Sequence, residues 1–487
     1  ALTEIQIEME VERTCVLKWG KNIYDIEIAA ESGLEFKERV EKLTHLPVGK
    51  QNIICNALWK GFLQDSYMFT PSEAPDFCTF VLVGSTSDAI ANVTGHQFVG
   101  DMSATDAIKS GILPPAGLVN LMNTCYANSV IQVLHKIPEL EDAVKTYPDS
   151  GAAHGTPGAL VAELKKTFEA MDSSITAVKP FNLIGEIRRN EVFGARTNGI
   201  YQQQDAQEFL SYLLNALSAV FPTHHKSMDS NLVKDLFQIT YRCSYECPES
   251  GETLETEETS DTLYCNIRGG PNDEEKVNFM FQGIQLGLES SVEKHSETLG
   301  RSASWKKHMK ISRLPKYLCV EFMRFYWKAL PDSQDGGVAC KIMRAVEFPF
   351  RFDVREHCTG ELQRSLNGVR AVLEGEEYAE CVKEFAENKE IRDGILLSLL
   401  EETGEEAMGD LPVGFAGFYE LIGIVSHMGS SVKGGHYVGW IKQKGKWYKC
   451  DDDKVSSVTK QRIRELKGGS EAHSAYLCLY KYIDSNQ

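Results

Sequence analysis

Two different hydrophobic periods follow one another in the first part of the chain. Strand-forming residues flank a Gly20-Lys21-Asn22 turn, which predicts a β-hairpin. Apolar residues then recur at helical spacing in 34–43, and short apolar runs follow. The predicted elements are, in order, a hairpin over 14–28, a helix over 34–43 and strands over 51–56 and 78–83. We therefore expect a small β-rich domain at residues 1–84, in which 1–12 is an extra strand or a leader.

The composition changes abruptly after this domain. Residues 85–115 are small and polar, with Pro114-Pro115 near their end. Such a stretch is typical of a flexible tether between packed units. It would let the small domain dock elsewhere while the larger domain engages a substrate.

Residues 116–484 form a second pattern, helical at first and strand-rich later. Helical spacing extends from Cys125 and recurs in 160–171 and 203–221, whereas strands are predicted from about residue 235 onward. The predicted strands cover 237–243, 317–325 and 419–427. An acidic helical stretch at about 372–410 interrupts them, and we interpret it as a surface insertion, with partner binding as the alternative.

One cysteine lies where a polar loop meets an apolar helix. Cys125 precedes the apolar periodicity of Val130 to Leu134, with Asn123 or Thr124 as candidate N-cap. The positive end of the helix dipole favours the thiolate, the nucleophilic form. Asn120, just upstream, could donate its amide to an oxyanion. The alternative is a small buried hydrophobic residue, the usual state of an intracellular cysteine.

A late histidine and a cluster of acids complete a candidate thiol-protease set. His436 follows Gly434-Gly435, and Asp451-Asp452-Asp453 ends the next extended segment. An acid that holds one imidazole nitrogen leaves the other to face a thiol. Strand alternation lets only some of the three acids face inward, so Asp452 competes with Asp451. His427 lacks the flanking glycines, and we expect it to be structural.

Four ordered segments resemble the ubiquitin-specific proteases, and in particular the proteasome-associated type with an N-terminal ubiquitin-like domain. They are the Cys125 loop, the box Gln203 to Leu210, the stretch Leu314 to Phe325, and the His436/Asp451 region. The resemblance implies an α+β fold, with a ubiquitin-like β-grasp domain followed by a papain-like protease of fingers, palm and thumb. It implies hydrolysis at the C-terminal glycine of ubiquitin.

The same resemblance assigns roles to individual residues. Cys125 would be the nucleophile, His436 its base and acid, Asp451 the orienting acid and Asn120 the oxyanion donor. Gln204 and Asp205 would grip ubiquitin's arginine-containing tail, although a helix cap explains Asp205 equally well. Gly434 and Gly435 fit a narrow channel for the Gly-Gly tail, or a simple turn.

Three features of the resemblance affect activity. Met122 stands where the family has glycine, so it could strain the oxyanion loop or crowd the channel. Ala127 and Cys450 also depart from the usual residues. The loops 331–337 and 429–434 resemble segments that lie across the tail groove, and we expect low activity until the proteasome is bound; exposed hairpin ends are the alternative.

Charge and composition restrict the partners and cofactors. A net charge of −18 disfavours nucleic acid, and no apolar run approaches a membrane span. Scattered cysteines favour a reducing cytoplasm, and also the nucleus. Cys243 and Cys247 lack a second pair to complete a zinc site, so we expect neither metal nor cofactor. The expected partners are ubiquitin, its conjugates and, through the ubiquitin-like domain, the regulatory particle of the 26S proteasome; the free enzyme should be a monomer.

Three functions remain open at this point. The first is an active deubiquitinating protease, which the intact Cys125, His436 and Asp451 favour. The second is a catalytically weak ubiquitin-binding regulator of the proteasome. The third is a papain-like protease of unrelated peptides, which the Gly434-Gly435 pair disfavours.

Overall fold

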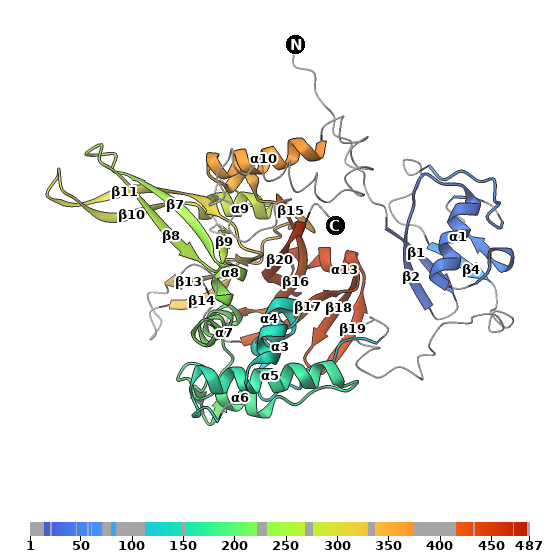
Figure 1. Cartoon of the computed structure of the whole chain (residues 1–487), viewed down its shortest axis with the longest axis horizontal. Coiled ribbons are helices and arrows are strands. Elements are labelled where there is room, and N and C mark those ends of the chain that lie inside the picture. The colour runs from blue at the N-terminus through green and yellow to red at the C-terminus, as the bar shows by residue number, and fades with distance from the viewer. Residues whose placement is uncertain are drawn as a thin grey trace, which may run out of the picture. The chain divides into compact units, whose positions relative to one another are not determined.

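The computed structural model divides the chain into two compact units, Ala1–Asp101 and Met102–Gln487 (Figure 1). The residues that it describes are 14–19, 22–44, 46–55, 58–59, 61–70, 79–83, 113–148, 151–221, 231–267, 276–329, 337–374, 415–431, 434–470 and 472–484. Most of the predicted tether and all of residues 1–12 lie outside them. Among the described residues, no helix combines the length and apolarity that crossing a bilayer requires.

The first unit is a four-stranded mixed sheet with one long helix. Its elements are β1 (Thr14–Trp19), β2 (Asn22–Glu27), α1 (Gly33–Thr44), η1 (Val48–Lys50), β3 (Asn52–Ile54) and β4 (Thr79–Val83). The strand order is β2-β1-β4-β3, with β1 and β4 parallel. Phe36 and Val40 of α1 join Leu17 and Phe80 in the core. The predicted hairpin, helix and two strands are confirmed.

Helices form the first part of the second unit. They are α3 (Cys125–Leu134), α4 (Pro138–Thr146), α5 (Pro157–Ser173), α6 (Phe181–Ile187), α7 (Ala206–Val220) and α8 (Leu232–Phe237), with the short hairpin β5 (Arg196–Thr197) and β6 (Ile200–Tyr201) before α7. Their apolar faces share one core with the central sheet. The helical character predicted for this part of the chain is confirmed.

Strands dominate the rest, in two main sheets. The central sheet has the order β19-β18-β17-β16-β20-β12-β9, with β15 beside β16. A second sheet, β10-β11-β7-β8, extends away from it as the fingers (Figure 1). The strands are β7 (Ile239–Glu246), β8 (Thr253–Ser260), β9 (Leu263–Cys265), β10 (Glu289–Ser296), β11 (Arg301–Arg313), β12 (Tyr317–Phe322), β15 (Arg351–Asp353), β16 (Phe415–Ser431), β17 (Gly434–Gln443), β18 (Lys446–Asp451), β19 (Lys454–Val458) and β20 (Ser474–Asp484). This mixture of helices and sheets is the predicted α+β class.

Two glycines let α3 approach the central sheet closely. A Cβ on Gly423 of β16 would lie 2.7 Å from Val133, and one on Gly439 of β17 would lie 3.1 Å from the Ser129 carbonyl. Larger residues would push the helix outward. Since α3 begins at Cys125 and Gly439 lies three residues after His436, these contacts set the distance between thiol and imidazole.

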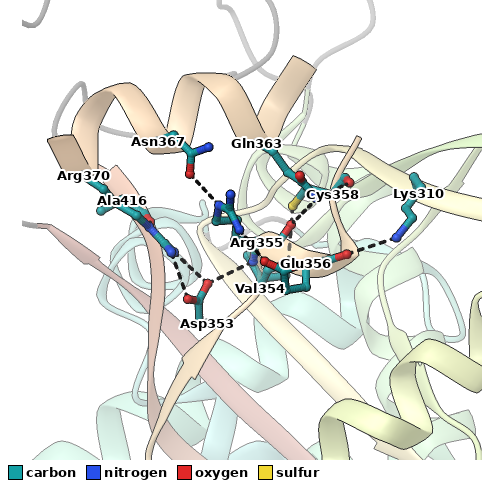
Figure 2. A network of polar contacts seen from close by, with 10 residues as sticks. All are labelled: Lys310, Asp353, Val354, Arg355, Glu356, Cys358, Gln363, Asn367, Arg370 and Ala416. Atoms are coloured by element: carbon teal, nitrogen blue, oxygen red, sulfur yellow. Dashed lines mark hydrogen bonds and ion pairs between the residues drawn. The ribbon is translucent and has the colours of Figure 1, made fainter. Parts of the chain in front are cut away.

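The segment leading into the acidic insertion is fastened to the sheet. Helix α10 (Gly360–Glu374) follows η4 (Arg355–His357), and Arg370 forms a two-pronged ion pair with Asp353 of β15, at 2.7 and 3.0 Å (Figure 2). Arg370 also donates to the Ala416 carbonyl of β16 at 2.7 Å, and Arg355 donates to Asn367. Residues 372–374 of the predicted insertion are the end of α10; the remainder, 375–410, lies outside the described residues.

Several elements differ from the sequence-based expectation. Two helices interrupt the strand-rich part. Helix α9 (Met280–Gly287), which is short and carries two glycines, was not predicted, and α10 begins at Gly360, before the helical stretch predicted from about residue 372. The segment predicted as strand 317–325 is broken at Met323 and Arg324, between β12 and β13 (Phe325–Ala329), which pairs with β14 (Gly337–Lys341). Residues 331–336 and 432–433 lie outside the described residues, but both connect paired strands, as the hairpin alternative predicts.

Candidate active site

The thiol lies at the start of α3, as predicted. Cys125 is the first helical residue and only 3% exposed, and Thr124 is the N-cap. The Thr124 hydroxyl does not cap the helix but accepts from the Leu121 amide at 2.9 Å. The first amides of α3 therefore present the positive end of the helix next to the sulfur.

The β17–β18 hairpin brings an imidazole and a carboxylate to this thiol. His436 Nε2 lies 2.6 Å from Asp451 Oδ1, so Nδ1 is the ring nitrogen left for the sulfur. The hydrogen-bonded contact with Cys125, supported by Asp451 and opposed by burial, raises the pKa of His436 to about 9. The imidazole is therefore positively charged at neutral pH, as a thiolate–imidazolium pair requires.

Asp451, rather than its neighbour, is the partner of His436. Burial opposes ionisation of Asp451, but hydrogen bonds from Lys449, at 2.7 Å, and from His436 prevail and lower its pKa. Asp452 lies in the turn with φ of +52°, and its carboxylate, although within 4.8 Å of a ring nitrogen of His436, forms its hydrogen bonds with Asn120 and Asn128. The competition between the two acids is thus resolved by the β18–β19 turn.

Asp452 instead fastens the loop that carries Asn120. Its carboxylate accepts from Asn120 Nδ2 and from Asn128 Nδ2, each at 2.8 Å, and its carbonyl accepts from the Leu118 amide at 2.9 Å. Asn120 Oδ1 accepts from the Thr124 amide at 3.1 Å. An amide nitrogen carries two hydrogens, so one remains on Nδ2 for a substrate oxygen. Sequence reasoning missed this function of Asp452, because the contacts join residues more than 300 positions apart.

Gln203 also reaches the thiol, which the sequence did not indicate. Its Nε2 lies 3.9 Å from Cys125 Sγ, and its side chain is buried. The sequence Gln202-Gln203-Gln204 does not indicate which of the three glutamines lies near the thiol. Gln204, the predicted tail-binding residue, donates to the Val192 carbonyl at 2.8 Å.

Asp205 caps α7, as the structural alternative predicts. Its carboxylate accepts from the amides of Gln207 and Glu208, at 2.7 and 3.1 Å. Tyr476 of β20 donates to the same carboxylate. Burial nevertheless raises the pKa of Asp205. This cap does not preclude a substrate contact, because both amides donate to Oδ1 and Oδ2 keeps the capacity to accept from a substrate group.

The glycine pair before His436 opens β17. Gly434 and Gly435 are exposed, and Gly435 has φ of +128°. A Cβ on Gly435 would lie 2.7 Å from Nε2 of His427. His427 is fully buried, packs its ring against Tyr437, and has its pKa lowered to about 3 mainly by burial. It supports the glycine loop and does not join the thiol, in agreement with the structural role expected for it.

Metal-ligating groups among the described residues are already used in other contacts. His436, Asp451 and Asp452 lie close together, but Lys449, Asn120 and Asn128 donate to the two carboxylates. The group His135, Glu141 and Asp172 contains the ammonium of Lys145. Cys243 and Cys247 are buried free thiols, and neither belongs to a cluster of three ligands in the described part of the chain. The absence of a structural metal stays a prediction.

The fold and this constellation define a class, the papain-like thiol hydrolases, with Cys and His on facing elements and an acid behind the His. The family within that class follows from comparison. The ubiquitin carboxyl-terminal hydrolase family model matches residues 116–480, and the chain belongs to this family. The predicted membership of the ubiquitin-specific proteases is confirmed.

Full-length relatives agree with this assignment. Ubiquitin carboxyl-terminal hydrolase 6 of Schizosaccharomyces pombe is 33% identical over 96% of this chain and 98% of its own. Hydrolase 6 of Arabidopsis thaliana is 30% identical with the same coverage. Hydrolase 14 of Caenorhabditis elegans is 29% identical over 96% of this chain and 92% of its own. The protein is thus a deubiquitinating thiol hydrolase, with ubiquitin and ubiquitin conjugates as partners.

The pH profile should report the Asp451–His436 contact. We expect kcat/KM of the wild type to fall above about pH 9, where His436 loses the proton that it gives to the leaving group. Asp451→Asn removes the charge that stabilises the imidazolium, so this falling limb should move to lower pH. The measurement is hydrolysis of a ubiquitin fluorogenic substrate from pH 6 to 10, with the exposed Asp453→Asn as control. If the alkaline limb of the pH profile stayed in place in Asp451→Asn, the assignment of Asp451 as the partner of His436 would be contradicted.

Met122 adopts the conformation for which glycine is suited. Its φ is +64°, and its side chain is 55% exposed, so it strains the backbone but does not crowd a buried channel. Left-handed backbone costs a side-chain-bearing residue about 1–2 kcal/mol, part of which glycine loses again in entropy. Met122→Gly should therefore stabilise the protein by about 0.5–1 kcal/mol in urea unfolding. The control Met323→Gly, at another exposed methionine whose φ is not positive, should destabilise the protein. If both substitutions changed the free energy of unfolding in the same direction, backbone strain at Met122 would be refuted.

Proposed function

We propose that Cys125 attacks the carbonyl of ubiquitin's C-terminal glycine and forms a thioester. In the thiolate–imidazolium pair, His436 already holds the proton taken from the thiol and gives it to the leaving lysine amine, and Asp451 orients the imidazole. Asn120 donates its free N–H to the oxyanion. The contact of His436 with both Cys125 and Asp451 carries this proposal.

The domain assignment is part of the same proposal. Residues 1–84 are a ubiquitin-like domain, 85–115 a linker, and 116–484 the catalytic domain with its insertion at about 372–410. Support for the first comes from a hairpin, a helix and further strands in a mixed four-stranded sheet around the Phe36 core. The cytoplasm, with its reducing conditions, suits the free thiols of the described cysteines.

The substrate is proposed to be conjugates bound at the proteasome, to which the ubiquitin-like domain docks. One face of β4 exposes two valines, Val81 and Val83, at 41% and 49%, while Phe80 and Leu82 point into the core. An apolar strand face of this kind is suited to a protein partner. The near-complete burial of Cys125 supports low activity before docking.

Fluorogenic ubiquitin hydrolysis with and without purified 26S proteasomes tests the proposal. Proteasomes should raise the rate of the wild type, and Val81→Lys should reduce this stimulation while the basal rate stays unchanged. Leu43→Lys, on the exposed side of α1, is the matched control and should keep the stimulation. A free enzyme as fast as its mixture with proteasomes would refute the regulation; no hydrolysis in either condition, with ubiquitin still bound, would favour the weak ubiquitin-binding regulator.

A further inference from the structure

Two carboxyl groups from distant parts of the chain meet beside the thiol site. Asp205 precedes α7, and Glu321 belongs to β12, the strand that pairs with β20. The Tyr476 hydroxyl of β20 lies between them, 2.8 and 2.9 Å from the Asp205 oxygens and 3.4 Å from Glu321 Oε1. Gln203, two residues before Asp205, touches Cys125, and Tyr437 directly follows His436. The Asp205–Glu321 pair is therefore next to the reacting groups.

The pair has too few donors for its acceptors. One hydroxyl carries one hydrogen, so Tyr476 can donate to only one carboxylate at a time. Asp205 also accepts two backbone amides, whereas Tyr476 is the one donor within reach of Glu321 among the described residues. No described Lys, Arg or His forms an ion pair with either acid.

A buried hydroxyl lies beside the pair. Tyr437 is 1% exposed, and its OH, next to the Asp205 carboxylate, forms no hydrogen bond of good geometry in the described structure. It lies close enough to Asp205 for the carboxylate charge to add to burial in raising the pKa of Tyr437. The Tyr437 hydroxyl is thus a third buried polar group beside the two carboxyls, and it adds no positive charge to them.

The charges of Asp205 and Glu321 indicate which kind of group this pair of acids would bind. Burial first, and then the charge of Asp205, raise the pKa of Glu321 to about 7, while Tyr476 opposes the shift. When two buried carboxyl groups lie near each other without a cation, repulsion and burial disfavour their charged forms. A cation placed between them would stabilise both carboxylates and lower their pKa values. Strongly perturbed acids in such a position are typical of functional sites.

We propose that Glu321 and Asp205 together bind one cationic side chain of the substrate tail, ahead of the cleaved glycine, and that Glu321 is a specificity residue of this enzyme. A guanidinium, planar and rich in donors, suits two carboxylates and a hydroxyl best. The inference rests on the ubiquitin hydrolase activity. It adds Glu321 to the tail contacts expected of Asp205.

Protonation of Glu321 should tune this contact. The titratable groups that face it are Asp205 before α7, Tyr476 of β20, Tyr264 of β9 and Cys319 of its own strand; Asp261, before β9, faces Tyr264 and Cys319. Lys234 faces Asp261, and Glu208 faces Asp205. Because the pKa of Glu321 is about 7, its carboxylate gains a proton and loses its charge below that pH, and tail binding should weaken as the pH falls through about 7.

Steady-state kinetics of the full chain test the proposal. Glu321→Gln, nearly isosteric, should raise KM for a ubiquitin fluorogenic substrate by about tenfold, the weight of one charge-assisted hydrogen bond, with kcat within about twofold. Glu255→Gln, at an exposed glutamate of β8, should leave KM unchanged. On substrates with each tail arginine replaced in turn by leucine, one replacement should raise the wild-type KM and abolish the difference between wild type and Glu321→Gln.

A binding experiment separates this contact from the chemistry. In the Cys125→Ala background, the Kd for labelled ubiquitin should rise as the pH falls from 8 to 6, and Glu321→Gln should flatten that change. An unchanged KM in Glu321→Gln, or a change that persists on every arginine-replaced substrate, would overturn the proposal. If the wild type failed to hydrolyse native ubiquitin at all, the deubiquitinase function itself would be wrong.

Discussion

Cys125→Ala is expected to lower kcat for a ubiquitin C-terminal fluorogenic substrate by at least about 10⁴-fold. Without the sulfur no thioester can form, and the remaining groups supply only orientation and oxyanion stabilisation. Ubiquitin should still bind, since the tail contacts proposed at Asp205 and Gly435 are unchanged. The measurement is kcat, together with covalent labelling by an electrophilic ubiquitin probe.

Cys340→Ala is the matched control for this experiment. Cys340 is the one described cysteine that is not buried, whereas Cys125 is 3% exposed. Accessibility alone would direct an electrophile to Cys340, but the contact with His436 and the α3 dipole favour Cys125. Labelling should disappear in Cys125→Ala and persist in Cys340→Ala. Labelling that persists in Cys125→Ala would refute the nucleophile assignment.

Local sequence patterns predicted the parts of the site that local structure determines. The start of α3 at Cys125 follows from the change of a polar loop into an apolar period. The β17–β18 hairpin that carries His436 and Asp451 follows from alternation around a short turn. The left-handed backbone at Met122 was signalled by the family's glycine at that position.

Contacts between distant segments could not be predicted in this way. Alternation left Asp451 and Asp452 open, and only the positive φ of Asp452 in the turn sends its carboxylate to Asn120. Glu321 lies in a strand of otherwise buried residues, where sequence gives no sign that Tyr476 and Asp205 face it. Such groupings arise from sheet order and helix packing, which pair residues regardless of their separation in sequence.

Asn120→Ala should lower kcat by about 10²–10³-fold with little change in KM. This is the typical effect of losing one oxyanion donor, because the interaction strengthens only as the oxygen becomes charged. Asp452→Ala should lower kcat by about tenfold or more, since it frees the Asn120 amide from the 2.8 Å contact that orients it. Asp453→Ala, at the exposed neighbouring acid, should leave kcat unchanged.

The double variant decides whether Asp452 acts through Asn120. When the Asn120 amide is absent, Asp452 has no amide to orient, and its loss should have little further effect on kcat. The kcat of Asn120→Ala/Asp452→Ala should therefore equal that of Asn120→Ala within about twofold. If the two effects multiplied instead, Asp452 would act by another route, such as its contact with Asn128 in α3. The falling limb of the pH profile gives an independent check: Asp451→Asn should move it further than Asp452→Ala does, because Asp451 forms the 2.6 Å hydrogen bond with His436, whereas Asp452 forms its hydrogen bonds with Asn120 and Asn128.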